Sequence, residues 1–187
     1  MRRRGLMAAR SAASALGAYA AARIARAFID HIDLPPSPVI AGYAPLKGEV
    51  DPLPLLQELT AMGATIALPV AEANKPLSFH KWKPGDPLIP GAFGAREPAA
   101  AAALRPNVLI VPLVAFDREG WRLGRGGGFY DRTIAELRAA GPVVTVGIAF
   151  AAQRVPQVPR ELHDQRLDWI VTEEGAHKAP AMLDGHP

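Results

Sequence analysis

The chain has 187 residues, of which 49% are hydrophobic and 21% charged, and it contains no cysteine. This length suits one domain spanning residues 1–187, and the lack of cysteine excludes a disulfide scaffold, a thiol nucleophile and a cysteine-ligated metal. The formal net charge is +3, but residues 1–29 carry six arginines and no acid, whereas the rest carries 15 basic and 18 acidic residues. We therefore expect no nucleic-acid partner, because phosphate binding needs a basic face on the domain itself. No stretch is long and apolar enough to predict a membrane span, so we expect no membrane partner.

Residues 1–33 predict a basic amphipathic helix. Its apolar side chains recur at spacings of three and four, which places the following on one stripe: Leu16, Tyr19, Ala20, Ile24, Ala27 and Phe28. A start rich in Arg, Ala and Ser and without acids is also typical of an organellar transit peptide, so this alternative stays open for residues 1–28. A secretory signal fits less well, because Arg10 and Arg23 interrupt the apolar region.

A strand and a second helix follow. Prolines within residues 34–38 end the first helix, and residues 39–43 predict a short buried strand. Asp51 and Pro52 predict a helix start, with Asp51 as the cap, and Gly63 predicts its end. The expected buried face of this helix consists of Leu53, Leu56, Leu59 and Met62.

The remaining chain alternates strands with one more helix. Strands are predicted at five apolar segments, namely 65–70, 77–82, 108–111, 143–149 and 167–171. Residues 74–107 otherwise resemble a loop, residues 131–140 predict a helix, and residues 175–187 predict a frayed tail. This alternation predicts an α/β fold, a Rossmann-like three-layer α/β/α sandwich with a mostly parallel central sheet.

Residues 122–132, Arg-Leu-Gly-Arg-Gly-Gly-Gly-Phe-Tyr-Asp-Arg, form the most unusual segment. Glycines let backbone N–H groups approach a ligand closely, and the start of the following helix adds a partial positive charge. The segment therefore predicts an anion cradle to which Arg122 and Arg125 add full charges. A flexible loop with solvated arginines is the alternative. Phe129 stands where a dinucleotide-binding fingerprint needs its last glycine, and the Gly-Lys-Ser/Thr of a Walker loop does not occur.

Carboxylates and histidines supply further candidates. Asp131, beside the cradle, and Asp164 suit a hard cation such as Mg²⁺. Glu49 follows the first strand, and open α/β sheets bind ligands at the carboxyl ends of their strands. His163 next to Asp164 could orient a metal or a substrate, or form a structural hydrogen bond. The sequence has neither a Gly-x-Ser-x-Gly nor a His-Glu-x-x-His motif.

Blocks of sequence in a fixed order make the chain recognisable. The main block runs from residue 111 to 132, and supporting blocks lie at 43 with 48–51, at 68–70, at 93–98, at 146–150 with 153, and at 163–164 with 167–168. These blocks closely resemble the 5-formyltetrahydrofolate cyclo-ligase (methenyltetrahydrofolate synthetase) family. The resemblance covers about residues 39–174.

The resemblance implies an ATP- and Mg²⁺-dependent closure of 5-formyltetrahydrofolate to 5,10-methenyltetrahydrofolate, with release of ADP and phosphate. It implies that the formyl oxygen takes the γ-phosphoryl group, after which N10 attacks the activated carbon and phosphate leaves. The nucleophiles belong to the substrate, so the protein need only position groups, neutralise charge and exclude water. It also implies a coenzyme A transferase-like variant of the three-layer sandwich. A catalytically inactive folate- or nucleotide-binding regulator of the same fold, or an enzyme of similar architecture that uses sugar phosphates or coenzyme A, is the alternative.

The resemblance also assigns roles to residues. Asp131 and Asp164 match magnesium positions, and Glu49 matches the acid that binds the pterin. Phe93 and Tyr130 are candidates for aromatic walls around the folate. Trp82 is a further candidate, and for it plain packing explains the residue equally well. The candidate catalytic residues are Arg125 and Tyr130, and the residues implied to line ATP and the formyl group are Arg122, Leu123, Gly124, Arg125, Gly126, Gly127, Gly128, Phe129 and Tyr130.

Two positions depart from the family pattern. Many members carry Lys where Gly127 stands, so we expect Arg125 to make that phosphate contact alone. Members usually open with a Lys-x-x-x-Arg helix that contacts ATP and is followed by a second helix. Here no lysine precedes Lys47, and we expect either an earlier start or substitution by Arg2–Arg4 and Arg10. We expect a monomer in the cytoplasm, or in an organelle if residues 1–28 are a transit peptide.

Overall fold

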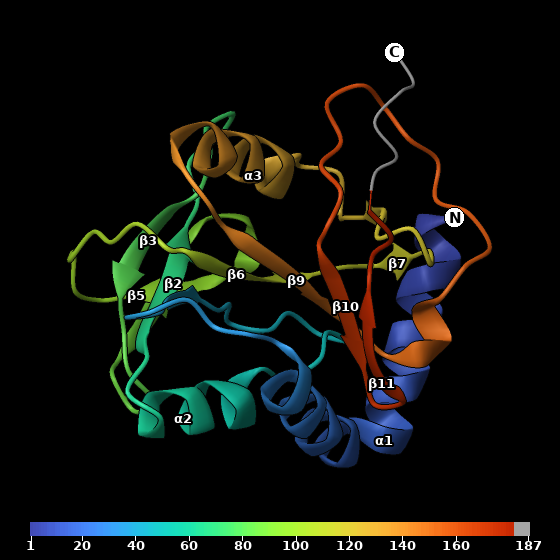
Figure 1. The fold of residues 1–187 in the computed structure, drawn as a ribbon, viewed down its shortest axis with the longest axis horizontal. Coiled ribbons are helices and arrows are strands. Elements are labelled where there is room, and N and C mark those ends of the chain that lie inside the picture. The colour runs from blue at the N-terminus through green and yellow to red at the C-terminus, as the bar shows by residue number, and fades with distance from the viewer. Residues whose placement is uncertain (182–187) are drawn as a thin grey trace.

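The computed structural model describes residues 1–181 and contains a seven-stranded sheet with helices on both faces (Figure 1). Its strands, in spatial order, are β11 (Gly175–Lys178), β10 (Trp169–Thr172), β9 (Val144–Ile148), β6 (Val108–Pro112), β1 (Val39–Ala41), β2 (Thr65–Val70) and β3 (Ser78–Lys81). The five inner strands are mutually parallel, and only the edge strands β11 and β3 pair antiparallel. This confirms the predicted α/β class with a mostly parallel sheet.

The helices form the two outer layers. α1 (Arg2–His31) and α2 (Leu53–Ala61) cover one face, and α3 (Phe129–Ala140) covers the other (Figure 1). Each face of the sheet packs against its helices in a separate hydrophobic core, and strand β6 contributes to both. Val108 and Ile110 lie in the core under α1 and α2, while Leu109 and Val111 lie in the core under α3. All four are fully buried, as the continuous apolar run predicts for a central strand covered on both sides.

α1 buries only part of the predicted stripe. Ile24 and Phe28 lie in the core, but Leu16 and Tyr19 are exposed. The rest of the buried face consists of small residues, namely Gly5, Ala9, Ala12, Ala20, Ala21 and Ala25. Small side chains let the helix axis approach its neighbours closely, so the large apolar residues do not mark the contact face. The predicted helix is thus confirmed, and it contributes to the core.

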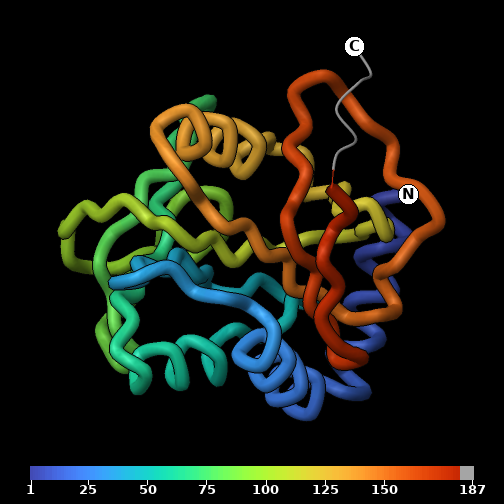
Figure 2. The backbone as a smooth tube through the Cα atoms, in the orientation of Figure 1, coloured from blue at the N-terminus to red at the C-terminus, as the bar shows by residue number. Residues whose placement is uncertain are grey.

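Gly5 marks the closest approach of α1 to the rest of the fold. A Cβ atom at this position would lie 2.5 Å from the carbonyl oxygen of Val114, so only glycine fits. Figure 2 shows the start of α1 running alongside the segment that follows β6. The first turn of the helix is thereby held beside the connection between β6 and α3.

α2 also differs in part from its prediction. The N-cap of α2 is Pro52, not the predicted Asp51, which precedes it and accepts a hydrogen bond from the backbone N–H of Leu53 at 2.9 Å. Gly63 has a φ of +91°, which confirms the predicted end of the helix. The buried residues are Leu55, Leu56 and Leu59. Leu53, the first residue of the helix, and Met62, its C-cap, are exposed.

Several short elements were not predicted. β4 (Leu88–Pro90) and β5 (Arg96–Pro98) form a hairpin within the region expected to be loop, and β7 (Ala115–Phe116) pairs with β8 (Arg122–Leu123). The expectation of a frayed tail from residue 175 is wrong for 175–178, which form β11 on the edge of the sheet; residues 182–187 lie outside the described part. Across residues 1–181, no helix combines the length and apolarity needed to cross a membrane.

Candidate functional site

The site lies where the sheet changes its direction of winding. From β1 the chain passes through α2 to β2 on one side, whereas from β6 it passes through α3 to β9 on the other side. Because α2 and α3 cover opposite faces, the two connections diverge and leave a crevice beyond the carboxyl ends of β1 and β6. Ligands bind at such a position in open α/β sheets.

A cavity of about 900 Å³ occupies this crevice, at the upper end of the size range of small-molecule sites. Its walls come from the segment after β1, the segment from β6 to the start of α3, the β4–β5 hairpin and the first turn of α1. The cavity brings together all the predicted site residues except Trp82. These are Glu49, Phe93, residues 122–130, Asp131 and Asp164.

The glycine loop, residues 124–128, has the backbone geometry of an anion cradle. Gly126 and Gly128 adopt φ values of +105° and +63°, which residues with a side chain rarely adopt, and Gly128 directly precedes α3. Within residues 1–181, the backbone N–H groups of this loop donate no hydrogen bond. Arg132 steadies the loop from the first turn of α3 by donating to the carbonyl oxygen of Gly127 at 2.9 Å. The unused donors and the start of α3 therefore suit an anionic group in the cavity.

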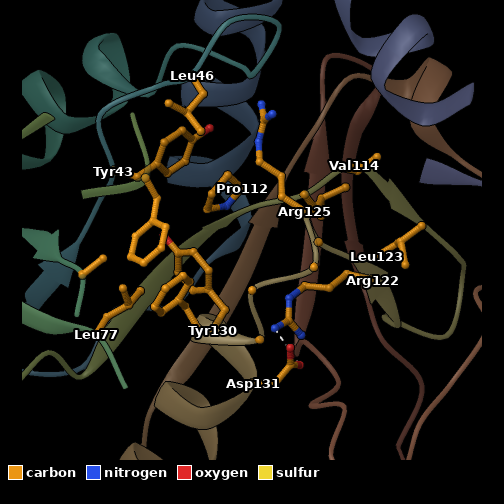
Figure 3. Close-up of a pocket in the computed structure, with 18 of the residues that line it drawn as sticks. Tyr43, Leu46, Leu77, Pro112, Val114, Arg122, Leu123, Arg125, Tyr130 and Asp131 are labelled. Atoms are coloured by element: carbon orange, nitrogen blue, oxygen red, sulfur yellow. Dashed lines mark hydrogen bonds and ion pairs between the residues drawn. The ribbon is translucent and has the colours of Figure 1, made fainter. Parts of the chain in front are cut away.

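Arg122 is held in an ion pair beneath the glycine loop. Its Nη2 donates to Oδ1 of Asp131 at 2.8 Å, and its Nη1 donates to the carbonyl oxygen of Gln165 (Figure 3). Burial lowers the pKa of Arg122, and the neighbouring Asp131 partly opposes this shift. Arg122 precedes the loop and Asp131 follows it, so their ion pair connects the two ends of the loop. The prediction that Arg122 supplies a charge to an anion is thus qualified, because its charge is already paired.

Arg125 and Glu49 form a second ion pair across the cavity. Arg125 Nε donates to Glu49 Oε1 at 2.9 Å, and the other oxygen of Glu49 accepts from the backbone N–H of Leu46 at 2.8 Å. The side chain of Arg125 is 38% exposed and that of Glu49 is 11% exposed. The two residues are 76 positions apart in the sequence, and the fold makes them partners.

Two tyrosines form the wall beside this pair, and Figure 3 shows them next to each other. Burial raises the pKa of Tyr130, and the negative charge of Glu49 raises it further. Burial and Glu49 raise the pKa of Tyr43 in the same way, and its hydroxyl donates to the carbonyl oxygen of Val50 at 2.7 Å. Both phenols are therefore neutral hydrogen-bond donors over the physiological pH range.

Asp131 and Asp164 both line the cavity, as the magnesium prediction requires. Asp131 Oδ1 accepts from Arg122 and from the backbone N–H of Gln165, and Asp164 Oδ2 accepts from the backbone N–H of Glu161. The second oxygen of each carboxylate accepts no hydrogen bond from residues 1–181. Mg²⁺ commonly binds one or two carboxylates together with phosphate oxygens and water. Within residues 1–181 no group of three or more His, Cys, Asp or Glu side chains could hold a metal ion, so an ion at this pair would need phosphate or water as its further ligands. His163 also lines the cavity, with its Nε2 3.4 Å from Glu161.

The aromatic candidates separate in the structure. Phe93 lines the cavity and packs against Phe129, with ring centroids 5.0 Å apart. Trp82 does not reach this cavity; it is buried, donates from Nε1 to the carbonyl oxygen of Asp86 at 3.1 Å, and lines a separate small cavity. Its predicted place beside the folate is therefore not supported, and packing explains this residue.

The first turn of α1 reaches the site. Arg2 and Arg3 line the cavity, and Arg2 Nε donates to the carbonyl oxygen of Gly124 at 3.2 Å. Arg10 instead packs against Gly48, outside the cavity lining. Sequence reasoning assigned no role to Tyr43 or Glu97, which also line the cavity, although both fall within the blocks that carry the resemblance.

Comparisons with known proteins place the chain in a family. The model of the 5-formyltetrahydrofolate cyclo-ligase family matches residues 1–173. The 5-formyltetrahydrofolate cyclo-ligase of Mycolicibacterium smegmatis is 35% identical over 143 residues, covering 71% of this chain and 72% of the relative. That of Escherichia coli K12 is 36% identical over 140 residues, covering 71% and 76%.

Solved structures give the same answer at the level of the fold. The 5,10-methenyltetrahydrofolate synthetase of Aquifex aeolicus superposes with a TM-score of 0.77 at 30% identity, covering 99% of this chain and 95% of the other. A 5,10-methenyltetrahydrofolate synthetase from Mycoplasma pneumoniae superposes with a TM-score of 0.73 at 20% identity, covering 92% and 96%, and at that identity it supports the fold alone. The family match over most of the chain, together with these relatives, shows that the chain belongs to the 5-formyltetrahydrofolate cyclo-ligase family of enzymes.

Proposed function

We propose that this enzyme converts 5-formyltetrahydrofolate and ATP into 5,10-methenyltetrahydrofolate, ADP and phosphate. In this scheme the formyl oxygen attacks the γ-phosphorus and ADP leaves. N10 then attacks the activated formyl carbon and loses its proton, and the C–O bond breaks to release phosphate, which can take up that proton. The observation that carries the proposal is the glycine loop with unused N–H donors, which faces Glu49 across one cavity.

Neighbouring groups in the cavity suit the two substrates. The N–H groups of residues 124–128, the start of α3 and the Arg125 guanidinium suit the phosphates, because each supplies positive charge without a chemical step of its own. Glu49 suits the amino-pyrimidine edge of the pterin, because a carboxylate accepts paired hydrogen bonds. Both substrates would then meet at Tyr130, where a neutral phenol can donate to the formyl oxygen or to a phosphate oxygen.

Asp131 and Asp164 are the residues that would hold Mg²⁺, through the carboxylate oxygens that accept no hydrogen bond within residues 1–181. When bound there, the ion would neutralise charge on the phosphates. The chain's own contribution is to fix both carboxylates. Arg122 and the N–H of Gln165 orient Asp131, and the N–H of Glu161 orients Asp164.

The test is an assay of purified protein with MgATP and 5-formyltetrahydrofolate, following methenyltetrahydrofolate by its absorbance and ADP by a coupled enzyme. We expect the two products to form in equal amounts. Methenyltetrahydrofolate formation without ATP would contradict the phosphorylation scheme. Tight folate binding without turnover would instead favour a folate-binding regulator of the same fold.

A further inference from the structure

The β4–β5 hairpin carries a carboxylate that the proposed chemistry does not use. Glu97 lies on β5, and its Oε1 accepts two backbone hydrogen bonds, from Ala71 N at 3.1 Å and from Ala92 N at 3.3 Å. Ala71 follows β2 at the carboxyl edge of the sheet, and Ala92 begins the tip of the hairpin. One oxygen atom therefore ties the tip of the hairpin to the rigid sheet.

Gly91 makes this tie possible. A Cβ atom at position 91 would lie 2.2 Å from Glu97 Cδ and 2.5 Å from Oε1, closer than atoms can approach. Its φ is −108°, so the backbone conformation itself does not require glycine. The position requires glycine because the carboxylate of Glu97 occupies the space of a side chain.

The tip that Glu97 holds presents Phe93 in a strained conformation. Phe93 has a φ of +57°, which is rare for a bulky residue and persists where the surrounding structure enforces it. Phe93 as a whole is 62% exposed, and it lines the cavity. Its ring packs at a tilt of 57° against Phe129, which begins α3. An exposed aromatic ring held in a strained backbone over a cavity offers a flat surface to a ligand.

We propose that Glu97 is a positioning residue that holds Phe93 as an aromatic wall for the bicyclic ring of the folate. This inference rests on the proposed function for the identity of the ring, but the tie itself does not. Glu97 acts through the acceptor capacity of one oxygen, so its charge is not needed. A glutamine, whose side-chain carbonyl can accept the same two hydrogen bonds, should therefore replace it.

The experiment compares Glu97→Ala, Glu97→Gln and Gly91→Ala with the unchanged protein. The dissociation constant for 5-formyltetrahydrofolate is measured by calorimetry without ATP, and KM for each substrate and kcat are measured in the complete assay. We expect Glu97→Ala and Gly91→Ala to weaken folate binding by roughly tenfold, the upper range for one aromatic contact, with KM for ATP unchanged. Glu97→Gln should remain within about twofold. Gly17→Ala is the matched control, because a Cβ atom there meets nothing within 4 Å.

A double variant tests whether Glu97 acts through Phe93. Phe93→Ala should weaken folate binding as much as Glu97→Ala does, and the pair together should weaken it no further. The proposal is overturned if Glu97→Gln is as impaired as Glu97→Ala, since the charge would then matter. It is also overturned if Gly91→Ala binds folate normally, or if the effects at positions 93 and 97 add.

Backbone amide exchange of Ala71 and Ala92 separates this inference from the proposed function. Both amides should exchange faster in Glu97→Ala and Gly91→Ala than in Glu97→Gln, whatever the protein binds. If the amides behave so but the unchanged protein does not bind 5-formyltetrahydrofolate, the tie stands and the folate assignment fails. If the amides exchange equally in all variants, the tie fails even when the enzyme is active.

Discussion

The ion pair between Arg122 and Asp131 connects the two ends of the glycine loop, and its contribution to the free energy of unfolding can be measured. We predict that Arg122→Met, which keeps the length of the side chain and removes its charge, destabilises the fold. The side chain of Arg122 is 4% exposed and that of Asp131 is 19% exposed, so the pair is largely shielded from water. Breaking a buried pair by removing one partner costs about 3–5 kcal/mol, because the remaining charge is left uncompensated.

Two features place the expected cost near the lower limit. Asp131 keeps its hydrogen bond from the backbone N–H of Gln165, and its partial exposure lets water approach the carboxylate. We therefore expect a loss of about 3 kcal/mol in the free energy of unfolding. For a chain of this size, that loss corresponds to a fall in Tm of roughly 6–12 °C.

Urea unfolding at constant pH measures the free energy of unfolding. Arg118→Met is the matched control, because Arg118 is exposed and its replacement should change stability by less than about 0.5 kcal/mol. The double variant Arg122→Met with Asp131→Asn should be more stable than the sum of the two single effects, by about 1–3 kcal/mol, since it leaves no unpaired charge. The ion pair would be refuted as a support of the glycine loop if Arg122→Met were as stable as the control. It would also be refuted if the effects of the two substitutions on the free energy of unfolding simply added.

Four further predictions concern the cavity. Arg125→Ala should lower kcat by roughly 10²-fold, because charge neutralisation on the transferred phosphoryl group is lost, and steady-state assays measure this. Glu49→Gln should weaken folate binding. In the absence of folate it should tighten nucleotide binding by about two- to fivefold, because the partly exposed carboxylate of Glu49 no longer competes with the nucleotide for Arg125. Calorimetry with ADP measures this change, and weaker ADP binding would contradict the prediction. Asp164→Asn should raise the Mg²⁺ concentration needed for half-maximal activity, and an unchanged titration would remove it from the metal site. Tyr43 and Tyr130 have pKa values raised above 10.0, so they stay protonated in the fold at a pH where they ionise in the unfolded chain. Below about pH 10 these two groups should therefore not change the free energy of unfolding, and above that pH they should lower it. Urea titrations at several pH values measure this, and Tyr43→Phe should show a smaller decrease than the unchanged protein.

The sequence predicts the parts of the fold that local chemistry determines. The run of residues 108–111 predicts a central strand because a strand covered on both faces has no polar side, and β6 has this position. The glycine loop is recognisable because four glycines in five residues have few purposes other than close backbone approach. Glycine at 63 likewise predicts a helix end, where a positive φ is found.

What the sequence does not predict depends on contacts between distant segments. The hairpin of β4 and β5 is short and rich in proline and glycine, so it lacks the run of β-branched residues that predicts a strand. The buried face of α1 consists largely of alanines, and its position follows from the close approach of Gly5 to Val114. The pairing of Arg125 with Glu49 joins segments 76 residues apart, and no local pattern reveals such a pair.

The position of α1 has a consequence for how the chain acquires its structure. This helix is synthesised before every strand of the sheet, yet it packs against β10 and β11, which come last among the seven strands. A 30-residue helix rich in alanine can form early on its own, since it is well beyond the length at which isolated helices become stable. The core that holds Ile24 and Phe28 also includes Val171 of β10, so it stays incomplete until residues 169–178 have been made. Contacts between such distant segments slow folding, so the nascent chain is most prone to aggregate before its last strands are complete.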